Sequence, residues 1–340
     1  MTAVESYSSV DYHTAGEPFR IVTSLPEPIL GDDVASKRVF AMRSPQIERI
    51  RKILCFEPRG HADMYGGFVV DPDDEGAHFG VLFWHKDGFS TACGHGTIAL
   101  GTWAIESGLV APHPSGVTDV VIDVPSGRVT ARVRTTAHGA VESVDFINVP
   151  GYVLADGVPV ATSRGEVRID VTYGGAIYAQ LDARSVGLEV TPQHYGDIIA
   201  IGREVKRALR DSPHAAHPDD ERLSGIYGTI VYEALPDAAG RVHQRNATVF
   251  ADGEVDRSPC GSGTSARVAT LTASGILGEG RELLHESIVG SRFVARAVER
   301  GTHGEFATVT PQVTGTAYRT GEHTFSVDPR DELVPGFVLR

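Results

Sequence analysis

The feature of this sequence that most constrains its fold is an internal repeat. Starting at Cys93 the chain reads CGHGTIALGTWAIESGLV, and starting at Cys260, 167 residues further on, it reads CGSGTSARVATLTASGIL. The two copies share seven identical residues in eighteen positions without a gap, including both cysteines. A repeat at about half of the chain length predicts two similar halves, each with the same loop-to-helix element.

Each copy predicts a glycine-rich turn that leads into a buried helix. In the first copy the run Ile98–Ile105 is too apolar for a helix on the surface. Gly108 and Gly275 stand where glycine ends a helix in the left-handed conformation. Each half therefore presents one thiol, that of Cys93 or Cys260, at the N-terminus of a buried helix. There we expect the helix dipole and the N–H groups to favour the thiolate and to bind anions.

Many short β-rich runs surround these helices. Single glycines and prolines separate the runs, a pattern typical of sheets that curl into barrels or sandwiches. A boundary between two parts of the chain is predicted near Pro150–Val158, where Gly and Pro bracket a short apolar stretch. The polar stretch Asp211–Arg222 predicts a surface loop. The predicted helices are Ile47–Leu54, Thr97–Ser107, Pro192–Leu209 and Thr264–Ser274. The predicted strands are Arg20–Ser24, Gly67–Val70, Gly80–Trp84, Val117–Val124, Val129–Val133, Arg168–Thr172, Ala247–Phe250, Arg292–Ala297, Phe306–Val309 and Thr316–Tyr318.

Charge and cysteine content narrow the classes of partner and compartment. Acidic residues number 44 and basic residues 31, so the net charge of −13 disfavours nucleic acid and anionic membranes as partners. No run reaches about 18 apolar residues, and Met1–Val10 does not resemble a secretory signal. Three cysteines, an odd number, argue against a disulfide framework. We therefore expect a cytoplasmic protein.

Several roles are open to the cysteines. Cys55 lies in an apolar run and is predicted to be a small buried hydrophobic residue, whereas glycine follows both Cys93 and Cys260. A metal site would lack a Cys-x-x-Cys pair, and Ser262 replaces His95 in the second copy, so the ligands are not repeated. A Cys–His hydrolase would use Cys93 and His95, but residues two apart in a turn rarely pair, and Cys260 would stay idle.

The remaining role uses both thiols at once. Inverting an α-carbon requires one group that removes a proton from one face and another that returns a proton to the opposite face. A duplicated fold places two such groups opposite each other, one as thiolate and one as thiol. The glycine-rich N–H groups would hold a substrate carboxylate and stabilise the charge that develops on it. Neither motif contains a lysine, so we expect the chemistry to run without pyridoxal phosphate.

Three motifs resemble those of the proline racemase family. They are Asp11–Pro18 (DYHTAGEP), the turn Cys93–Gly96 (CGHG) and Asp256–Ala266 (DRSPCGSGTSA), of which the last is the most specific. That family contains proline racemases, 4-hydroxyproline 2-epimerases and trans-3-hydroxy-L-proline dehydratases. The resemblance runs from about Asp11 to the C-terminus.

The resemblance implies an α/β (α+β) fold that diaminopimelate epimerase shares. Two similar barrel-like domains, related by a pseudo-twofold axis, would each wrap round a central helix and close on the ligand between them. We expect residues 1–152 with about 315–340 in the first domain and residues 153–314 in the second.

The resemblance also implies the roles of the site residues. Cys93 and Cys260 would be the acid/base pair, and Asp256 would bind the ring nitrogen of a proline or hydroxyproline. No cofactor and no metal are implied, and the protein is expected to be a homodimer. The residues expected to bind the carboxylate are Gly94, His95, Gly261 and Ser262.

The residues point to two different branches of the family. Ala15 and Ala92 stand where the family often has Gly and Met, which bears on the shape of the pocket. The stretches Phe56–Gly66 (FEPRGHADMYG) and His217–Ile230 (HPDDERLSGIYGTI) resemble the dehydratase branch. Many dehydratases, however, replace one cysteine by Thr or Ser, because loss of a 3-hydroxyl needs only one proton abstraction from Cα. This chain keeps both cysteines.

These observations lead to one expected function and its alternatives. We expect a cofactor-independent racemase or epimerase that inverts Cα of proline or 4-hydroxyproline. The alternative within the same chemistry is a trans-3-hydroxy-L-proline dehydratase. An amino-acid-binding protein without catalysis would keep the glycine turns but would not need two thiols. A thiol redox protein would need the thiols but not the glycine-rich N–H groups that would hold a carboxylate.

Other polar residues in the motifs have structural interpretations. Glu17 and Asp63 are predicted to form structural ion pairs with Arg20 or Arg59. Histidines such as His13 and His61 could orient a loop or contact a ligand. The remaining histidines are predicted to be solvated or hydrogen-bonded residues without a role in the site; among them are His78, His85, His214, His217 and His285.

Overall fold

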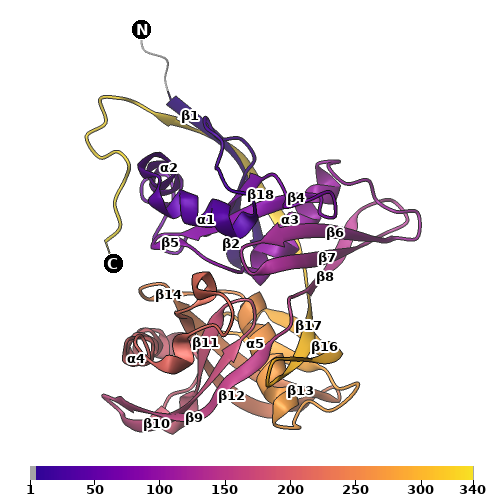
Figure 1. The fold of residues 1–340 in the computed structure, drawn as a ribbon, viewed down its shortest axis with the longest axis vertical. Helices are drawn as coiled ribbons and strands as arrows, with labels where there is room; N and C mark the ends of the chain where they lie inside the picture. Colours follow the sequence, from indigo (N-terminus) through magenta and orange to yellow (C-terminus); the bar gives the residue numbers. More distant parts are fainter. Residues whose placement is uncertain (1–4, 340) are drawn as a thin grey trace.

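The computed structural model describes residues 5–339 and is built mainly of strands (Figure 1). Strand pairing divides it into two halves. In the first, neighbouring strands follow the order β18–β1–β2–β3–β4–β6–β7–β8, with the short β5 beside β4. Their bounds are β1 Glu5–Thr14, β2 Glu17–Val22, β3 Gly66–Val70, β4 Phe79–His85, β5 Gly88–Phe89, β6 Val117–Val124, β7 Gly127–Thr135, β8 Val141–Ile147 and β18 Ala317–Val327.

The second half has the order β9–β10–β11–β12–β13–β15–β16–β17, with β14 beside β13. Strand β17 also pairs with β8, which joins the two sheets edge to edge, and the chain then returns to the first half in β18. The bounds are β9 Tyr152–Thr162, β10 Gly165–Tyr173, β11 Ile177–Asp182, β12 Ile226–Ala238, β13 Arg241–Phe250, β14 Glu254–Val255, β15 Leu283–Ser287, β16 Arg292–His303 and β17 Phe306–Gly315.

The halves repeat each other strand for strand, as the duplicated sequence predicts. The parallel pairs β2–β3 and β4–β6 of the first half correspond to β11–β12 and β13–β15 of the second. Helices occur at matching points: α1 and α2 between β2 and β3, and α4 between β11 and β12. Likewise α3 precedes β6 and α5 precedes β15. The expected α/β class with two similar halves is confirmed.

Each sheet curls round one central helix. Helix α3 (Gly94–Glu106) contacts β1 and β18 at one side of its sheet and β7 and β8 at the other. Helix α5 (Gly261–Ala273) contacts β9 and β10, and also β16 and β17, in the same way. Both helices are almost entirely buried. Gly108 and Gly275 each follow their helix with a φ of 75°, so the predicted left-handed endings are confirmed.

The outer helices show where the sequence pattern is informative and where it is not. The predicted helices correspond to α2 (Pro45–Cys55), α4 (Tyr195–Ala208) and the two central helices. Helix α1 (Val34–Arg43) is not predicted, because its buried residues include Lys37 and its apolar face is weak. Its start is set instead by Asp33, whose side chain accepts an N–H from Ser36. Within residues 5–339 no helix is long and apolar enough to cross a membrane.

Two sequence expectations about boundaries have different outcomes. The predicted strand Thr316–Tyr318 covers only the start of a longer strand, β18, which begins at Ala317 just after β17 ends at Gly315. The pairing edge at β8 and β17 lies beside the expected domain boundaries, but the division into residues 1–152 with 315–340 and residues 153–314 stays a prediction.

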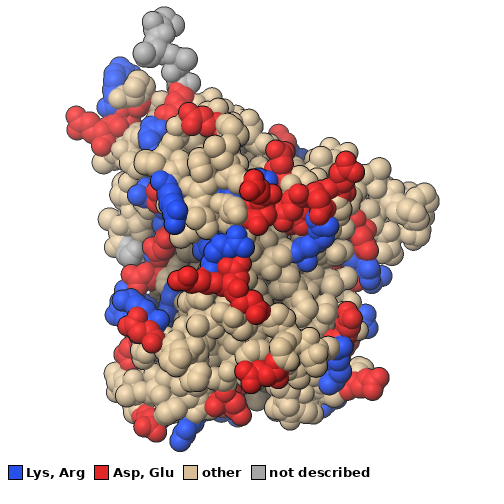
Figure 2. Space-filling view, viewed as in Figure 1, with Lys and Arg blue, Asp and Glu red and all other residues tan. Residues whose placement is uncertain are grey.

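Ion pairs and hydrogen bonds tie the two halves together. Arg257 pairs with Asp63 at 2.8 Å, and the backbone N–H of Asp252 donates to Asp87 at 2.7 Å. On the face drawn in Figure 2, acidic and basic side chains lie intermixed between the halves. The two sheets are therefore held in a fixed relation by polar contacts as well as by the β8–β17 pairing.

Candidate active site

The two repeated cysteines occupy equivalent positions at the starts of the central helices. Cys93 is the residue before α3 and Cys260 the residue before α5, and both side chains are buried. The sulfur of Cys93 accepts the N–H of Gly96 at 3.3 Å, and that of Cys260 accepts the N–H of Gly263 at 3.4 Å. The prediction of one thiol at the N-terminus of each buried helix is confirmed.

The two helix N-termini meet at a glycine pair. A Cβ atom added to Gly94 would lie 2.6 Å from the Cα of Gly261, and one added to Gly261 would lie 2.5 Å from the Cα of Gly94. No side chain fits between backbones at that separation, so glycine is required on both sides. The repeat therefore brings two positive helix ends, and the thiols beside them, to one place.

The same junction concentrates backbone donors. The first N–H groups of a helix have no partner within it and point toward its N-terminus. In each copy the third helical residue donates to sulfur, and the fourth donates to the carbonyl of the cysteine. The N–H groups left by helix geometry for a ligand are those of Gly94, His95, Gly261 and Ser262.

The Cys93 thiol lies against aromatic rings. Its sulfur is 3.4 Å from Nδ1 of His95, and the ring of Tyr65 contacts the His95 ring edge to face at 4.9 Å between centroids. Burial raises the pKa of Cys93 well above its usual range, although the Gly96 N–H lowers it. Burial likewise lowers the pKa of His95, so this imidazole is neutral in the site.

The Cys260 thiol has more hydroxyl neighbours. The Tyr178 hydroxyl is 3.8 Å from its sulfur and 2.7 Å from the hydroxyl of Ser262. Cys260 has a φ of 62°, in the left-handed region that a residue with a Cβ rarely adopts. Burial raises the pKa of this thiol too, while Gly263, Tyr178 and Thr248 lower it.

The N–H groups of Gly96 and Gly263 lower the pKa values of the two thiols, as expected at helix N-termini, but the net shift of both values is upward. Desolvation of a charged sulfur outweighs the helix N–H groups at Cys93 and at Cys260. The nearby Asp256 adds a negative charge that raises both pKa values further. Burial and Asp256 together thus hold the pKa of both thiols above the ordinary value for cysteine.

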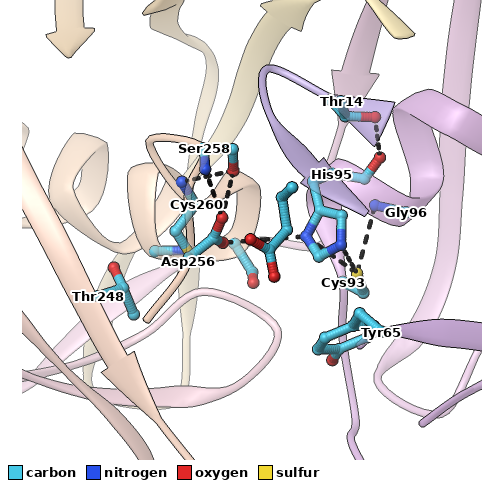
Figure 3. Close-up of polar contacts among 12 residues, drawn as sticks. Thr14, Tyr65, Cys93, His95, Gly96, Thr248, Asp256, Ser258 and Cys260 are labelled. Atoms are coloured by element: carbon cyan, nitrogen blue, oxygen red, sulfur yellow. Dashed lines mark hydrogen bonds and ion pairs between the residues drawn. The ribbon is translucent and has the colours of Figure 1, made fainter. Parts of the chain in front are cut away.

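Asp256 faces His95 across the junction (Figure 3). Its Oδ1 accepts the backbone N–H of Ser258 at 2.8 Å and the Ser258 hydroxyl at 2.7 Å. Its Oδ2 lies 3.9 Å from Nδ1 of His95. Figure 3 shows Cys93 and His95 on one side and Asp256 and Cys260 on the other. The Gly94–Gly261 contact and the Tyr178 hydroxyl, which lies near both Cys260 and Ser262, bring the remaining predicted site residues to the same junction.

The predicted ion pairs of Glu17 and Asp63 are wrong. Arg20 lies directly opposite Asp11 in the β1–β2 register and binds it at 2.8 Å, and Arg59 binds Asp331. Both acidic side chains turn instead to Arg257 of the second half. Asp63 binds the guanidinium, whereas Glu17 accepts the backbone N–H. Strand pairing satisfies Arg20 through Asp11, whereas Arg59 is satisfied by Asp331 from the C-terminal segment.

Three tyrosines that sequence reasoning did not select also line the site. The hydroxyls of Tyr65 and Tyr227 are 2.9 Å apart, and both phenol pKa values are raised by burial and by Cys93. Tyr65 lies within Phe56–Gly66 and Tyr227 within His217–Ile230, the two stretches that resemble the dehydratase branch. That shared resemblance was the signal that could have identified them. The third, Tyr178, lies in a stretch for which the sequence analysis predicts no element and no role.

Outside this site, the histidines differ in their surroundings. Nδ1 of His13 accepts the N–H of Gly16, and Nδ1 of His61 accepts that of Asp63, so both orient their own loops. His85, Asp87 and Glu254 lie close enough together to hold a metal ion. The Lys86 ammonium, however, is 2.6 Å from Asp87 and 3.9 Å from Glu254, so a cation would compete with it there.

A pocket of about 560 Å³ is lined by residues just before Cys93 in the chain, Ser90 and Thr91. It is lined by Ser90 and Tyr227, whose side chains connect through Tyr65 to the site. Its outer wall carries basic residues of α4, among them Arg203 and Lys206. The pocket thus connects solvent with the residues that immediately precede Cys93.

Comparison with known proteins identifies the family. The sequence model of the family described as Proline racemase matches residues 9–338. This chain belongs to the proline racemase family. A trans-3-hydroxy-L-proline dehydratase of Bacillus cereus is 40% identical over 340 residues, and a 3-hydroxyproline 2-epimerase of Burkholderia multivorans is 43% identical over 341 residues. Both alignments cover the whole of each chain.

A solved member of the family has the same fold. The crystal structure of a hydroxyproline epimerase from Agrobacterium vitis, with bound trans-4-hydroxy-L-proline, superposes with a TM-score of 0.91 at 30% identity. The match covers 98% of this chain and 96% of that one. The resemblance stated from the three motifs is confirmed, and with it membership of a family of isomerases and hydro-lyases.

Proposed function

We propose that this protein inverts Cα of proline or a hydroxyproline: one of the sulfurs of Cys93 and Cys260 removes the Cα proton, and the other donates its own proton to the opposite face. The observation that carries the proposal is the meeting of two matched helix N-termini at Gly94 and Gly261, each with its own thiol. A single thiol serves one face of a planar carbanion. Two thiols from duplicated halves serve both faces.

The helix ends bind the carboxylate in this proposal. The N–H groups of Gly94, His95, Gly261 and Ser262 surround it, and they stabilise the negative charge that moves onto it when Cα loses its proton. These groups belong to fixed helices, so they need no reorganisation during the reaction. His95 and Ser262 occupy the same position in the two copies, and only their backbone is required for this role.

Asp256 binds the ring nitrogen, and the resulting charge changes explain how a thiolate forms. A bound secondary ammonium places a positive charge beside Asp256, which otherwise raises the pKa of both thiols. Neutralising Asp256 therefore lowers both pKa values. One thiol ionises and takes the Cα proton, and the other, still protonated, donates its proton to the opposite face. The roles exchange in the reverse direction.

Dehydration of trans-3-hydroxy-L-proline is the second candidate. Relatives with that name are 40–43% identical to this chain, and the Tyr65–Tyr227 pair lies in the two stretches that resemble that branch. The Cα carbanion would form a C2–C3 double bond as the C3–O bond breaks. The oxygen would leave as water with a proton from the thiol on its face. One pair of cysteines thus supports both outcomes, and the position of the hydroxyl decides between them.

The test is incubation of the protein in D2O with L-proline, trans-4-hydroxy-L-proline and trans-3-hydroxy-L-proline separately. Optical rotation reports inversion, NMR reports deuterium at Cα, and absorbance reports elimination. We expect deuterium and inversion with the 4-hydroxy isomer. Reaction of the trans-3 isomer alone, with no deuterium in the other two, would replace inversion by dehydration as the function.

Three further properties belong to the proposal. We propose that the reaction needs neither metal nor pyridoxal phosphate, so it should survive EDTA, dialysis and carbonyl reagents. Alkylation by iodoacetamide should abolish it, and pyrrole-2-carboxylate should protect the thiols. A homodimer in the cytoplasm stays the expected form of the protein.

A further inference from the structure

Glu17 is a buried carboxyl group in the site for which the reaction above has no role. It begins β2, and no part of it is exposed to solvent. Its Oε2 accepts the backbone N–H of Arg257 at 2.7 Å. Its Oε1 is buried and has no hydrogen-bond partner among residues 5–339. Buried polar atoms are rarely left in this state unless something else binds them.

The position of Glu17 relates it to the ring-nitrogen site. The residue that donates to it, Arg257, directly follows Asp256 in the chain. Burial is the main cause that raises the pKa of Glu17 and that of Cys93; Asp256 adds to the first shift and Glu17 to the second, so the three groups lie within electrostatic reach of one another. Glu17 comes from the first half and Asp256 from the second.

The two carboxyl groups are held in the same manner. Asp256 commits Oδ1 to Ser258, and its Oδ2 faces His95 at 3.9 Å, beyond hydrogen-bond distance. Glu17 commits Oε2 to Arg257 and has Oε1 left. Each group therefore has one oxygen fixed by its own backbone contact and one available for a ligand. A pyrrolidine ring nitrogen, when protonated, has two N–H bonds and needs two acceptors.

We propose that Glu17 is a further substrate-binding residue, whose Oε1 accepts one N–H bond of the substrate's secondary ammonium while Oδ2 of Asp256 accepts the other. This inference rests on the proposed function, because it needs a ring amine as the ligand. It assigns one acceptor to each half of the molecule. The ring nitrogen then fixes the rotation of the ring, and with it the line between Cα and the two sulfurs.

The substitution Glu17→Gln separates this role from a structural one. The Arg257 N–H needs an acceptor, so the amide oxygen takes the place of Oε2 and the NH2 group takes the place of Oε1. A donor then faces the ammonium. Pyrrole-2-carboxylate has a planar nitrogen with a single N–H, for which Asp256 suffices. The two ligands therefore distinguish Glu17 from Asp256.

The experiment measures binding by calorimetry in a Cys93→Ser background, in which bound trans-4-hydroxy-L-proline is not turned over. Glu17→Gln is expected to weaken binding of the hydroxyproline about tenfold or more, and to leave pyrrole-2-carboxylate within about twofold. Asp256→Asn is expected to weaken both ligands. Equal losses for both ligands in Glu17→Gln, or no loss for either, would overturn the proposal.

A shorter carboxyl group provides the second variant. Glu17→Asp keeps an acidic acceptor but withdraws it from the ligand. We therefore expect this variant, too, to bind the hydroxyproline more weakly and pyrrole-2-carboxylate as before. Loss of pyrrole-2-carboxylate binding in both variants would make Glu17 a structural residue and overturn the proposal. Failure of the unchanged protein to exchange Cα deuterium with any of the three amino acids would remove the proposed function instead, so the two failures are distinguishable.

Discussion

The turns at Cys93 and Cys260 are copies of one element, yet their surroundings differ. Both start a buried helix, and in both the sulfur accepts the N–H three residues on. The Cys93 turn is extended, with a φ of −154°, whereas Cys260 has a φ of 62°. Two hydrogen bonds to the Pro259 carbonyl, from Asn246 and Thr264, hold the less favourable turn in place.

The chemical neighbours differ as well. The first sulfur lies beside the His95 imidazole, on whose ring Phe19 packs edge to face, while the second lies beside the Tyr178 hydroxyl. Duplication thus preserved the helix start and the N–H contact to each sulfur, whereas the backbone at the cysteine and the polarity round the sulfur diverged. An acid/base pair needs equal placement but not equal proton affinity, so the two thiols can differ in which one ionises more easily.

Replacing either of the two thiols is expected to have the largest effect on activity. We expect Cys93→Ser and Cys260→Ser each to reduce inversion by about 10²- to 10⁴-fold, because a serine hydroxyl does not ionise near neutral pH. Inversion is measured by optical rotation and by deuterium at Cα.

Dehydration of the trans-3 isomer tests the same two variants, but there the two thiols are not expected to be equally important. If the trans-3 isomer is dehydrated, only the thiol that faces its Cα–H is essential for proton abstraction, so the two variants should lose unequal amounts of activity. Near wild-type inversion in either variant contradicts the two-thiol mechanism.

The glycine pair is the next largest expected effect. Gly94→Ala and Gly261→Ala each push one helix end away from the other, because the added Cβ would lie 2.6 or 2.5 Å from the opposite Cα. A displacement of about 1 Å at a reacting centre costs about 10²-fold in rate, so we expect losses of that order in kcat/KM.

Gly196→Ala is the matched control for the glycine pair. Gly196 lies in the exposed face of α4, with nothing within 4 Å of an added Cβ, so activity should be unchanged. Thermal unfolding of that variant should shift upward, by about 0.5–1 kcal/mol of stability. Full activity in either junction variant would show that the helix ends do not need their close approach.

A smaller effect tests the difference between the two sulfurs. The Tyr178 hydroxyl lowers the pKa of the Cys260 thiol, so Tyr178→Phe should raise that pKa. The rising limb of kcat/KM against pH should then move to higher pH, with about a tenfold loss at neutral pH. Tyr65→Phe is the counterpart on the other side.

The Tyr65 hydroxyl contacts Ser90 and Tyr227, with no hydrogen bond to the Cys93 sulfur, so Tyr65→Phe should leave that limb in place. Equal shifts of the pH profile in both tyrosine variants would mean that the two thiols have equivalent surroundings.

The smallest expected effect concerns the third cysteine. Cys55 has no exposed surface and burial raises its pKa, so it should not react with iodoacetamide in the folded protein. Cys55→Ala should keep activity within about twofold and lose about 1 kcal/mol of stability. Labelling followed by mass spectrometry checks both points, and prominent alkylation of Cys55 would contradict them.

Much of this site follows from the sequence alone. The repeat determines two equivalent turns, because the same short-range features, a glycine-rich turn and an apolar run, produce the same helix start wherever they occur. Local chemistry also determines the left-handed ends at Gly108 and Gly275. The motifs around Cys93 and Cys260 sufficed to predict the family and the residues at the junction.

Only the tertiary structure decided how those residues are surrounded. Tyr178 contacts the Cys260 sulfur, and Glu17, Tyr65 and Tyr227 come within electrostatic reach of Cys93, although all four residues lie on segments far apart in the chain. Curling of both sheets round their helices brings these segments together. The pKa of a thiol depends on how far the sulfur is shielded from water, and all the segments packed round it contribute to that shielding. The sequence could therefore locate the two sulfurs, while their raised pKa values are a property of the assembled fold.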